Sequence, residues 1–289
     1  MTSAALPLAQ WRRTPAPLIV AGLAFFVAFG EPIITLFRDW WTVPEAGHGL
    51  LLFPIALWLG WKKGLVEEPH PQHALGLVIL TGSVLLRFAS GLAAELFTMR
   101  ASLLGAAAGL IIYTLGVRQL TRWWLPCGLI VLSVPLPAVV LGSLALPLQL
   151  KASQWGAALL SMRHVPVRLA GNVLSLPGRS LFVTEACSGL RSLTALLSLG
   201  LLIGGLWLRS PWSRALLMLA AIPVAMVLNA IRIFLTGFTV YFISPKLAEG
   251  FMHYSEGWVI FVVAFVLLGV MAWALQRSEM WLAARRAAA

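Results

Sequence analysis

Charged side chains are scarce in this chain. Asp, Glu, Lys and Arg make up only 11% of its 289 residues, whereas 60% of the residues are hydrophobic and the mean hydropathy is +0.90. A soluble globular domain carries about a quarter charged residues, so this composition excludes one. Because a spanning helix needs about 20 apolar residues, the length allows about eight spans with short loops. We expect a single integral membrane domain over residues 1–289.

Acidic residues are fewer than basic ones, with ten Asp and Glu against 21 Lys and Arg, and the formal net charge is +11. A nucleic-acid surface gathers its basic residues on one solvated face. In this chain the basic residues lie between apolar runs, where they mark cytoplasmic loops and helix ends. The expected partner of the surface is therefore the lipid bilayer, and not a nucleic acid.

Cysteine is limited to Cys127 and Cys187. HExxH motifs, paired CxxC motifs and carboxylate clusters are lacking, so no metal and no other cofactor is expected. The expected topology places the two cysteines at opposite membrane surfaces, separated by about 30 Å of bilayer. Bridged cysteines need Cα atoms within about 7 Å, which excludes a disulfide. We interpret Cys127 as a small packed apolar residue.

Apolar runs dominate the rest of the sequence. The first follows basic residues, as in a signal peptide, but it is long and no clear small-residue cleavage site follows it, so we expect an uncleaved span. Length and hydropathy predict eight spans in all. They cover residues 15–37, 48–61, 74–90, 93–116, 123–146, 188–208, 214–237 and 256–275.

The segment between the fifth and sixth runs differs in character. Residues 148–163 are typical of an amphipathic helix, and residues 166–183 carry the hairpin signals Gly171-Asn172 and Pro177-Gly178. The predicted fold is therefore an all-α polytopic membrane protein with about eight transmembrane helices. A small amphipathic helix and a β-hairpin-like segment precede the sixth span on the extracytoplasmic surface.

Basic residues also predict the orientation. On an eight-span layout, eleven of the 21 fall on connections that share one side, together with only Glu67, Glu68 and Glu279. By the positive-inside rule that side is the cytoplasm, so both termini are expected inside. Residues 145–187 and 238–255 then lie outside. The eleven basic residues are Arg12, Arg13, Lys62, Lys63, Arg118, Arg122, Arg209, Arg214, Arg277, Arg285 and Arg286.

Cys187 lies in the string TEACSGLR, where the extended segment turns into an apolar helix. Thr184 or Glu185 is suited to cap that helix. A cysteine in a first helical turn feels the positive end of the helix dipole, and Arg191 at i+4 adds a positive charge, so the thiolate is favoured. A lone cysteine in a span is more often structural, so a nucleophile at Cys187 requires partners.

Arg232 and His253 supply those partners. Arg232 lies in the apolar run 220–239, where a charge is costly and marks a candidate functional site; snorkelling to the outer headgroups is the alternative. Asn229, one turn away, is a polar partner for it. His253 lies at the outer entrance to the last span, and Glu256 one turn on is placed to fix its tautomer.

These three side chains come from the outer ends of three consecutive spans, so the helices can converge on one site. A thiol, a guanidinium and an imidazole are the inventory for acyl transfer. Cys187 is predicted to be the nucleophile, His253 the general acid and base, and Arg232 the group that stabilises a tetrahedral oxyanion.

The strings EACSGLRSL, NAIRI and AEGFMHYSEGW resemble the three signature motifs of the exosortase family, in the same order and on corresponding spans. The resemblance extends to Gly47-His48-Gly49 and Pro135-Leu136-Pro137. It implies a bacterial inner-membrane enzyme with catalytic Cys187, Arg232 and His253 at the periplasmic face. The implied partners are membrane-anchored proteins with a C-terminal tripartite sorting signal, as in PEP-CTERM proteins. AEGFxH and EGW resemble the subgroup associated with exopolysaccharide loci.

Other polar residues have weaker predictions. Arg87, Glu95 and Arg100 flank the third and fourth runs; they either pair with one another or meet substrate, and structural pairing is favoured. Several residues near the catalytic candidates are expected to orient them or to bind substrate: Glu185, Ser188, Arg191, Asn229, Glu256 and His48.

The resulting hypothesis is a cysteine transpeptidase or protease that acts through a thioester. Water as the second nucleophile gives a protease, and an amine acceptor gives a transpeptidase; the sequence leaves both open. The alternatives are a non-catalytic membrane subunit and a transporter of an exopolysaccharide export system.

Overall fold

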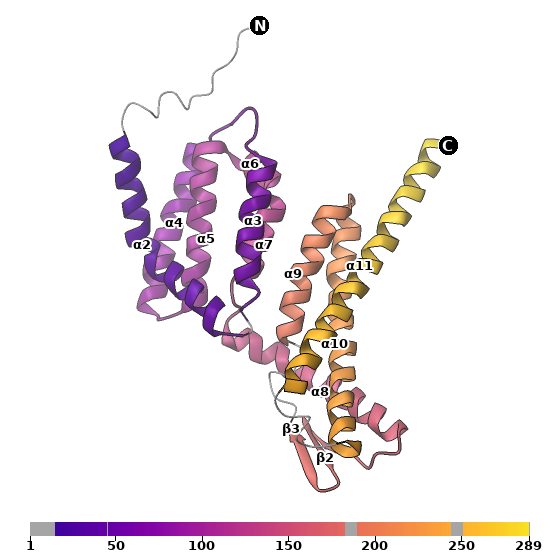
Figure 1. Ribbon diagram of the computed structural model, residues 1–289. Coiled ribbons are helices and arrows are strands. Elements are labelled where there is room, and N and C mark those ends of the chain that lie inside the picture. Colours follow the sequence, from indigo (N-terminus) through magenta and orange to yellow (C-terminus); the bar gives the residue numbers. More distant parts are fainter. Residues whose placement is uncertain (1–14, 45, 183–189, 244–250, 289) are drawn as a thin grey trace. The chain divides into compact units, whose positions relative to one another are not determined.

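The computed structural model describes residues 15–44, 46–182, 190–243 and 251–288. Helices make up most of this part of the chain, and a single small sheet lies between α8 and α9 in sequence (Figure 1). The helices are α2 (Pro15–Thr42), α3 (Gly49–Lys63), α4 (His73–Leu92), α5 (Leu96–Leu115), α6 (Val117–Arg122), α7 (Trp124–Ser133), α8 (Ala138–Met162), α9 (Leu190–Trp207), α10 (Pro211–Phe242) and α11 (Phe251–Ala288). The strands are β1 (Arg168–Ala170), β2 (Val173–Leu176) and β3 (Arg179–Phe182).

The chain packs as two compact units. Met1–Thr42 and Gly64–Arg122 form the first, which contains α2, α4, α5 and α6. Val43–Lys63 and Trp123–Ala289 form the second, which contains α3, α7 to α11 and the sheet. That residues 1–289 fold as one membrane domain stays a prediction.

In the first unit, α4 and α5 form a closely packed hairpin. A Cβ atom on Gly76 of α4 would lie 2.5 Å from the backbone nitrogen of Tyr113 in α5, so only glycine fits there. Gly109 of α5 faces the backbone of Leu80 in the same way. Small residues allow such close approach of helices in a membrane, where dispersion contacts replace the hydrophobic effect as the main attraction.

In the second unit, α9, α10 and α11 share an apolar core. Leu196 of α9, Leu217 of α10 and Leu268 of α11 are among its fully buried side chains. A separate cluster joins α3 to α7 through residues such as Leu59 and Leu129. Apolar side chains therefore hold each helix group together.

The predicted fifth span, residues 123–146, is wrong in its boundaries. α7 ends at Ser133, Val134 is extended with φ −77° and ψ 123°, and α8 begins only at Ala138. Pro135 and Pro137 explain the break, because each lacks an N–H donor and disfavours helical geometry in the residue before it. The predicted amphipathic helix, residues 148–163, is the later part of α8.

The prediction of a hairpin-like segment is confirmed, and its two predicted turns connect three strands. Its order is β1-β2-β3, with both pairs antiparallel. Gly171-Asn172 connects the paired residues Ala170 and Val173, and Pro177-Gly178 connects Leu176 and Arg179. Gly171 and Gly178 have positive φ, 61° and 79°, which L side chains avoid. The sheet packs through Leu174 and Leu176 on buried residues of α8 and α10.

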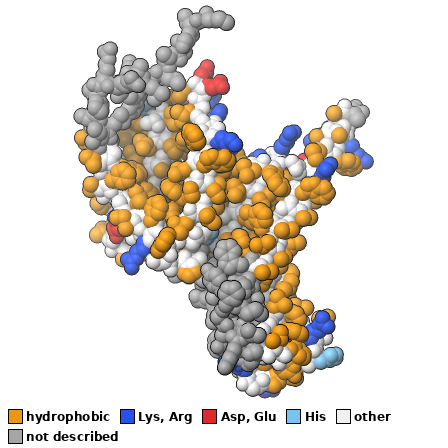
Figure 2. Space-filling view, viewed as in Figure 1, with side chains coloured by type: hydrophobic (Ala, Val, Ile, Leu, Met, Phe, Trp, Pro, Cys, Tyr) orange, Lys and Arg blue, Asp and Glu red, His pale blue; other side chains and the backbone are white. Residues whose placement is uncertain are grey.

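The apolar surface confirms a membrane protein. Among the described residues, four helices are long and apolar enough to cross a bilayer: His73–Leu92, Leu96–Leu115, Pro211–Phe242 and Val259–Ala287. Large side chains such as Val27 and Leu92 are 85% and 92% exposed, which water would penalise and lipid does not. Figure 2 shows hydrophobic side chains over most of the visible helical surface. The count of eight spans stays a prediction.

Candidate functional site

Arg232 lies on the stripe of α10 that faces the bundle interior. Ala221, Ala225 and Leu228 are buried at 0%, 4% and 5% exposure, and spacings of four, three and four residues carry this stripe to Arg232. Asn229 is buried beside it, at 5% exposure. The guanidinium therefore faces neighbouring helices. α10 continues for ten residues to Phe242, about 15 Å at a helical rise of about 1.5 Å, and snorkelling of Arg232 to the outer headgroups stays the alternative.

Arg232 and Asn229 line a small cavity of about 20 Å³ between α10, α9 and α11. α9 contributes Leu196, and α11 contributes Ile260 and Phe261. This arrangement brings a polar pair from α10 to α9, which follows Cys187 in sequence, and to α11, which contains His253. The cavity is lined by Leu196, Ala225, Leu228, Asn229, Arg232, Ile260, Phe261 and Ala264.

The other two catalytic candidates are only partly placed. His253 lies in the first turn of α11 and Glu256 in the next turn, although the described part does not include their side chains. Cys187, Glu185 and Ser188 lie outside the described residues, and α9 begins three residues after Cys187. Arg191 is the second residue of α9, again without a described side chain.

His48 connects the start of α3 to the end of α7 in the second unit. Its Nε2 atom lies 3.1 Å from the carbonyl oxygen of Leu132, near the end of α7. His48 itself precedes the first residue of α3, and Leu132 precedes the break before α8. The contact gives His48 a structural role in positioning the α7 end, and its contact with substrate stays a prediction.

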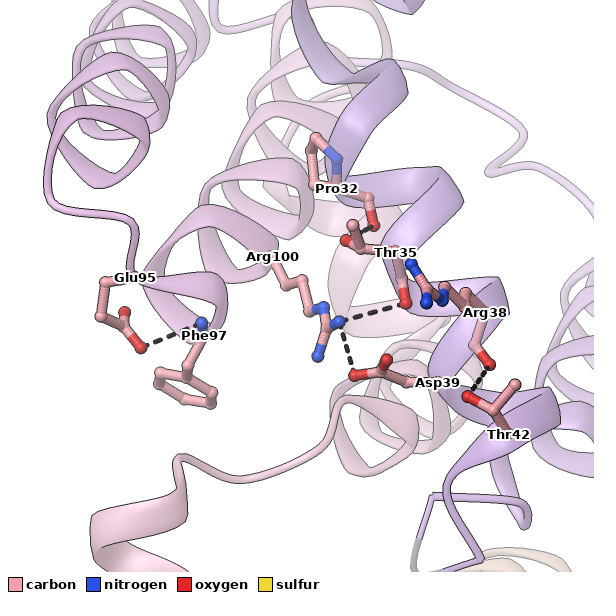
Figure 3. Close-up of polar contacts among 8 residues, drawn as sticks. All are labelled: Pro32, Thr35, Arg38, Asp39, Thr42, Glu95, Phe97 and Arg100. Carbon is pink, nitrogen blue, oxygen red and sulfur yellow. Dashed lines mark hydrogen bonds and ion pairs between the residues drawn. The ribbon is translucent and has the colours of Figure 1, made fainter.

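Charged residues of the first unit pair with α2, and the prediction that Arg87, Glu95 and Arg100 pair with one another is wrong. Arg100 Nη2 lies 2.7 Å from Asp39 Oδ2 and 3.1 Å from the carbonyl oxygen of Thr35 (Figure 3). Arg87 Nη2 lies 2.6 Å from Glu31 Oε2. The pairing is nevertheless structural, as favoured.

The α2 partners of Arg87 and Arg100, which were not predicted from the sequence, share one face of that helix. Glu31, Thr35 and Asp39 recur at intervals of four residues, which places them above one another on a helix. This spacing is the signal that could have identified them. Glu95 instead caps α5: its carboxylate accepts hydrogen bonds from the backbone N–H groups of Phe97 and Thr98, at 3.1 and 2.7 Å.

Tryptophans in the second unit stack with basic residues predicted to face the cytoplasm. The Trp124 ring lies 5.5 Å from Lys63 Nζ and 4.6 Å from Arg214 Cζ, which places the ends of three helices at one level. Indole rings prefer the membrane interface, where basic side chains also gather. In the described ranges no group of three or more His, Cys, Asp or Glu side chains has metal-binding geometry.

The lipid-facing helices and the inward Arg232 of α10 define an integral membrane protein with a polar site inside its helix bundle. The family model for transmembrane exosortase matches residues 40–270, and the chain belongs to this family. Membership supports a transmembrane function in protein sorting. The match covers His48, Cys187, Arg232 and His253. No curated protein and no solved structure matches the chain.

Proposed function

We propose that this protein is a cysteine transpeptidase or protease that cleaves C-terminal tripartite sorting signals at the outer face of the inner membrane. The observation that carries the proposal is that Arg232 has a buried Nε atom and lines a cavity shared with α9 and α11. Cys187 precedes the first of these helices by three residues, and His253 lies in the first turn of the second.

Chain connectivity supports convergence of the three groups. Leu190 follows Cys187 by three residues, a reach of at most about 10 Å for an extended chain. His253 precedes the cavity-lining Ile260 by seven residues on α11, about 10 Å of helix. α9 and α11 both run antiparallel to α10 (Figure 1). Their N-terminal ends therefore lie on the same side of the cavity as the C-terminal end of α10, and Arg232 is closer to that end than Asn229.

The proposed reaction has two acyl-transfer steps. The Cys187 thiolate attacks the scissile carbonyl of the sorting signal, and Arg232 stabilises the negative charge that develops on its oxygen. His253 donates a proton to the leaving amine, so the C–N bond breaks and a thioester remains. Water or an acceptor amine then attacks the thioester while His253 removes its proton. The acyl group leaves Cys187, which returns to a thiolate.

The substrate fits the membrane character of the site. A sorting signal with a hydrophobic helix can approach laterally through lipid, with its short motif outside the bilayer and its basic cluster in the cytoplasm. The family supports the sorting function, while the cleavage chemistry rests on the three side chains. The experiment therefore has to test the cleavage chemistry itself and not only a role in sorting.

The test is co-expression with a candidate tripartite substrate, followed by mass analysis of the new substrate C-terminus. Cys187→Ala is expected to abolish cleavage while the protein stays in the membrane, and Cys127→Ala is the matched control. A mass that matches hydrolysis identifies a protease, and added acceptor mass identifies a transpeptidase. Normal cleavage by Cys187→Ala would show that another residue is the nucleophile.

A membrane-impermeant thiol reagent separates the enzyme from a non-catalytic subunit or transporter. In intact cells it is expected to label Cys187 and not Cys127, because the proposed site opens to the periplasm. The Cys187→Ala variant provides the background. Labelling of Cys127 alone would contradict both the sidedness and the role of Cys187.

A further inference from the structure

A second cavity lies at the opposite end of the second unit, far along α10 and α11 from Arg232. Its volume is about 730 Å³, and its walls are the connection between α9 and α10 and the C-terminal part of α11. Nothing in the proposed catalytic reaction uses it. The residues on which its chemistry depends are Trp207, Arg209, Trp212, Glu279 and Arg286.

Glu279 holds one wall of this cavity in place. Its carboxylate accepts hydrogen bonds from the backbone N–H groups of Arg209 and Ser210, at 3.0 and 2.9 Å. These groups precede the first turn of α10, where a negative charge also interacts favourably with the helix dipole. Arg214 adds hydrogen bonds from Nε and Nη2 to the carbonyl oxygen of Leu208, at 3.0 and 2.8 Å. The turn is therefore fixed before any ligand binds.

Two cations of the cavity remain available for a ligand. The side chains of Arg209 and Arg286 are exposed, and in the described ranges their guanidinium groups have no hydrogen bond or ion pair. Arg277 and Arg285 differ, because they stack on Trp273 and Trp281, at 5.4 and 3.7 Å. Within the described lining, Glu279 is the sole acid and is already committed to backbone donors. The cavity therefore favours an anion.

The apolar part of the lining identifies the class of anion. Trp207 and Trp212 are 49% and 83% exposed, as expected of indoles at a membrane interface. They adjoin lipid-facing residues such as Leu206, which is 54% exposed. Cations next to indoles and lipid-facing side chains match a molecule with a phosphate at one end and acyl chains at the other.

We propose that this cavity binds the headgroup of an anionic phospholipid, with Arg209 and Arg286 contacting the phosphate and Trp207 and Trp212 flanking the acyl chains. The orientation predicted from the basic residues assigns this lipid to the cytoplasmic leaflet. The binding does not depend on Cys187 chemistry. A basic peptide, such as the cationic end of a sorting signal, is disfavoured because both available side chains carry the same sign of charge as the peptide.

The test uses the full chain in nanodiscs of phosphatidylcholine with or without phosphatidylglycerol, released into native mass spectrometry. Wild-type protein is expected to retain phosphatidylglycerol in preference to phosphatidylcholine. Arg209→Gln with Arg286→Gln should lower this preference about tenfold or more, because two charge-assisted contacts are lost. Arg277→Gln with Arg285→Gln is the matched control, with equal charge loss on side chains that stack on tryptophan, and should retain the preference.

Three further arms separate the outcomes. Arg286→Gln alone, near the exposed end of α11, should lower retention without a folding defect. Inorganic phosphate should not displace the lipid; displacement together with loss of lipid preference would identify a free-phosphate site and overturn the proposal. Binding of an oligolysine peptide that is lost in Glu279→Gln would also overturn it, as would equal lipid loss in the two double variants.

Discussion

Arg100 and Asp39 form a buried ion pair that joins α5 to α2, with 2.7 Å between Nη2 and Oδ2. The Arg100 side chain is only 3% exposed, and its partner is 26% exposed. The carbonyl oxygen of Thr35 accepts a second hydrogen bond from the same guanidinium nitrogen. Removing one partner therefore leaves a charge inside a helix bundle, where neither water nor lipid can compensate it.

We expect Asp39→Ala to destabilise the protein by about 3–5 kcal/mol, the usual cost of an uncompensated buried charge. The double variant Asp39→Leu with Arg100→Met should be more stable than Asp39→Ala, because no unpaired charge remains. Thermal unfolding of purified protein in detergent measures both. Glu31→Ala is the control: its carboxylate is 62% exposed, so the loss should be about 0–1 kcal/mol. Equal losses for Asp39 and Glu31 would contradict this.

Arg232→Lys keeps the positive charge and loses the planar fork that can donate two parallel hydrogen bonds. If Arg232 stabilises the oxyanion, cleavage should slow by about 100-fold or more, the usual effect of losing one such donor. The assay is the rate of appearance of the cleaved substrate at matched enzyme levels. Arg163→Lys, on an exposed position after α8, should cleave normally. A normal rate for Arg232→Lys would remove the guanidinium from the mechanism.

Glu95 makes stability depend on acid pH. Hydrogen bonds from the Thr98 side chain and backbone hold the pKa of the Glu95 carboxyl below its ordinary value of 4.5. A lowered folded-state pKa means that the charged cap stabilises the protein above pH 4.5 and that this contribution disappears as the pH falls through the folded value. Glu95→Ala should cost about 1 kcal/mol near neutral pH, as for other N-caps.

Thermal midpoints measured from neutral pH to below the folded-state pKa of Glu95 test this prediction. The difference between wild-type and Glu95→Ala protein should be largest near neutral pH and should shrink with acidification. A constant difference from neutral pH to below the folded pKa would show that the carboxylate charge is not what caps α5.

Gly116→Ala is expected to be destabilising, whereas Gly82→Ala should be tolerated. Gly116 has φ +87°, and a Cβ atom there would overlap the carbonyl oxygen of His70, so the chain must shift as well as adopt a strained conformation. Gly82 lies within α4 with nothing within 4 Å of its Cβ position, and alanine favours helix there. Thermal midpoints should fall for Gly116→Ala and stay or rise for Gly82→Ala. Similar midpoints for both variants would contradict the turn geometry at Gly116.

Local signals predicted the small sheet well. Gly171-Asn172 and Pro177-Gly178 encode their turns within two residues, and the structure has both turns where predicted. The predicted boundaries of the fifth span were wrong because hydropathy averages across Pro135 and Pro137 and so does not detect the missing backbone donors. At this position the backbone restrictions of proline end the helix, although the apolar run continues.

Polar partners were harder to predict than polar residues. Arg87 and Arg100 were identified as structural, but Glu31 and Asp39 lie more than fifty residues earlier. Their helical spacing places them on one face of α2 without showing which arginines they pair with. The orientation of Arg232 was easier to predict, because the residues that share its face belong to the same helix. Ala221, Ala225 and Leu228 recur with helical spacing. Tertiary pairing between distant helices depends on packing that a single sequence does not encode locally.

The short connection between the sheet and α9 has a consequence for the proposed nucleophile. Phe182 ends β3 five residues before Cys187, and Leu190 begins α9 three residues after it. An extended chain reaches at most about 3.3–3.6 Å per residue, so the Cα atom of Cys187 cannot lie more than about 18 Å from that of Phe182 or about 11 Å from that of Leu190. Inserting residues into this connection would loosen the tether and enlarge the region that the thiol can sample. In the proposed mechanism the sheet therefore serves as an anchor for the nucleophile, although none of its own side chains needs to touch the substrate.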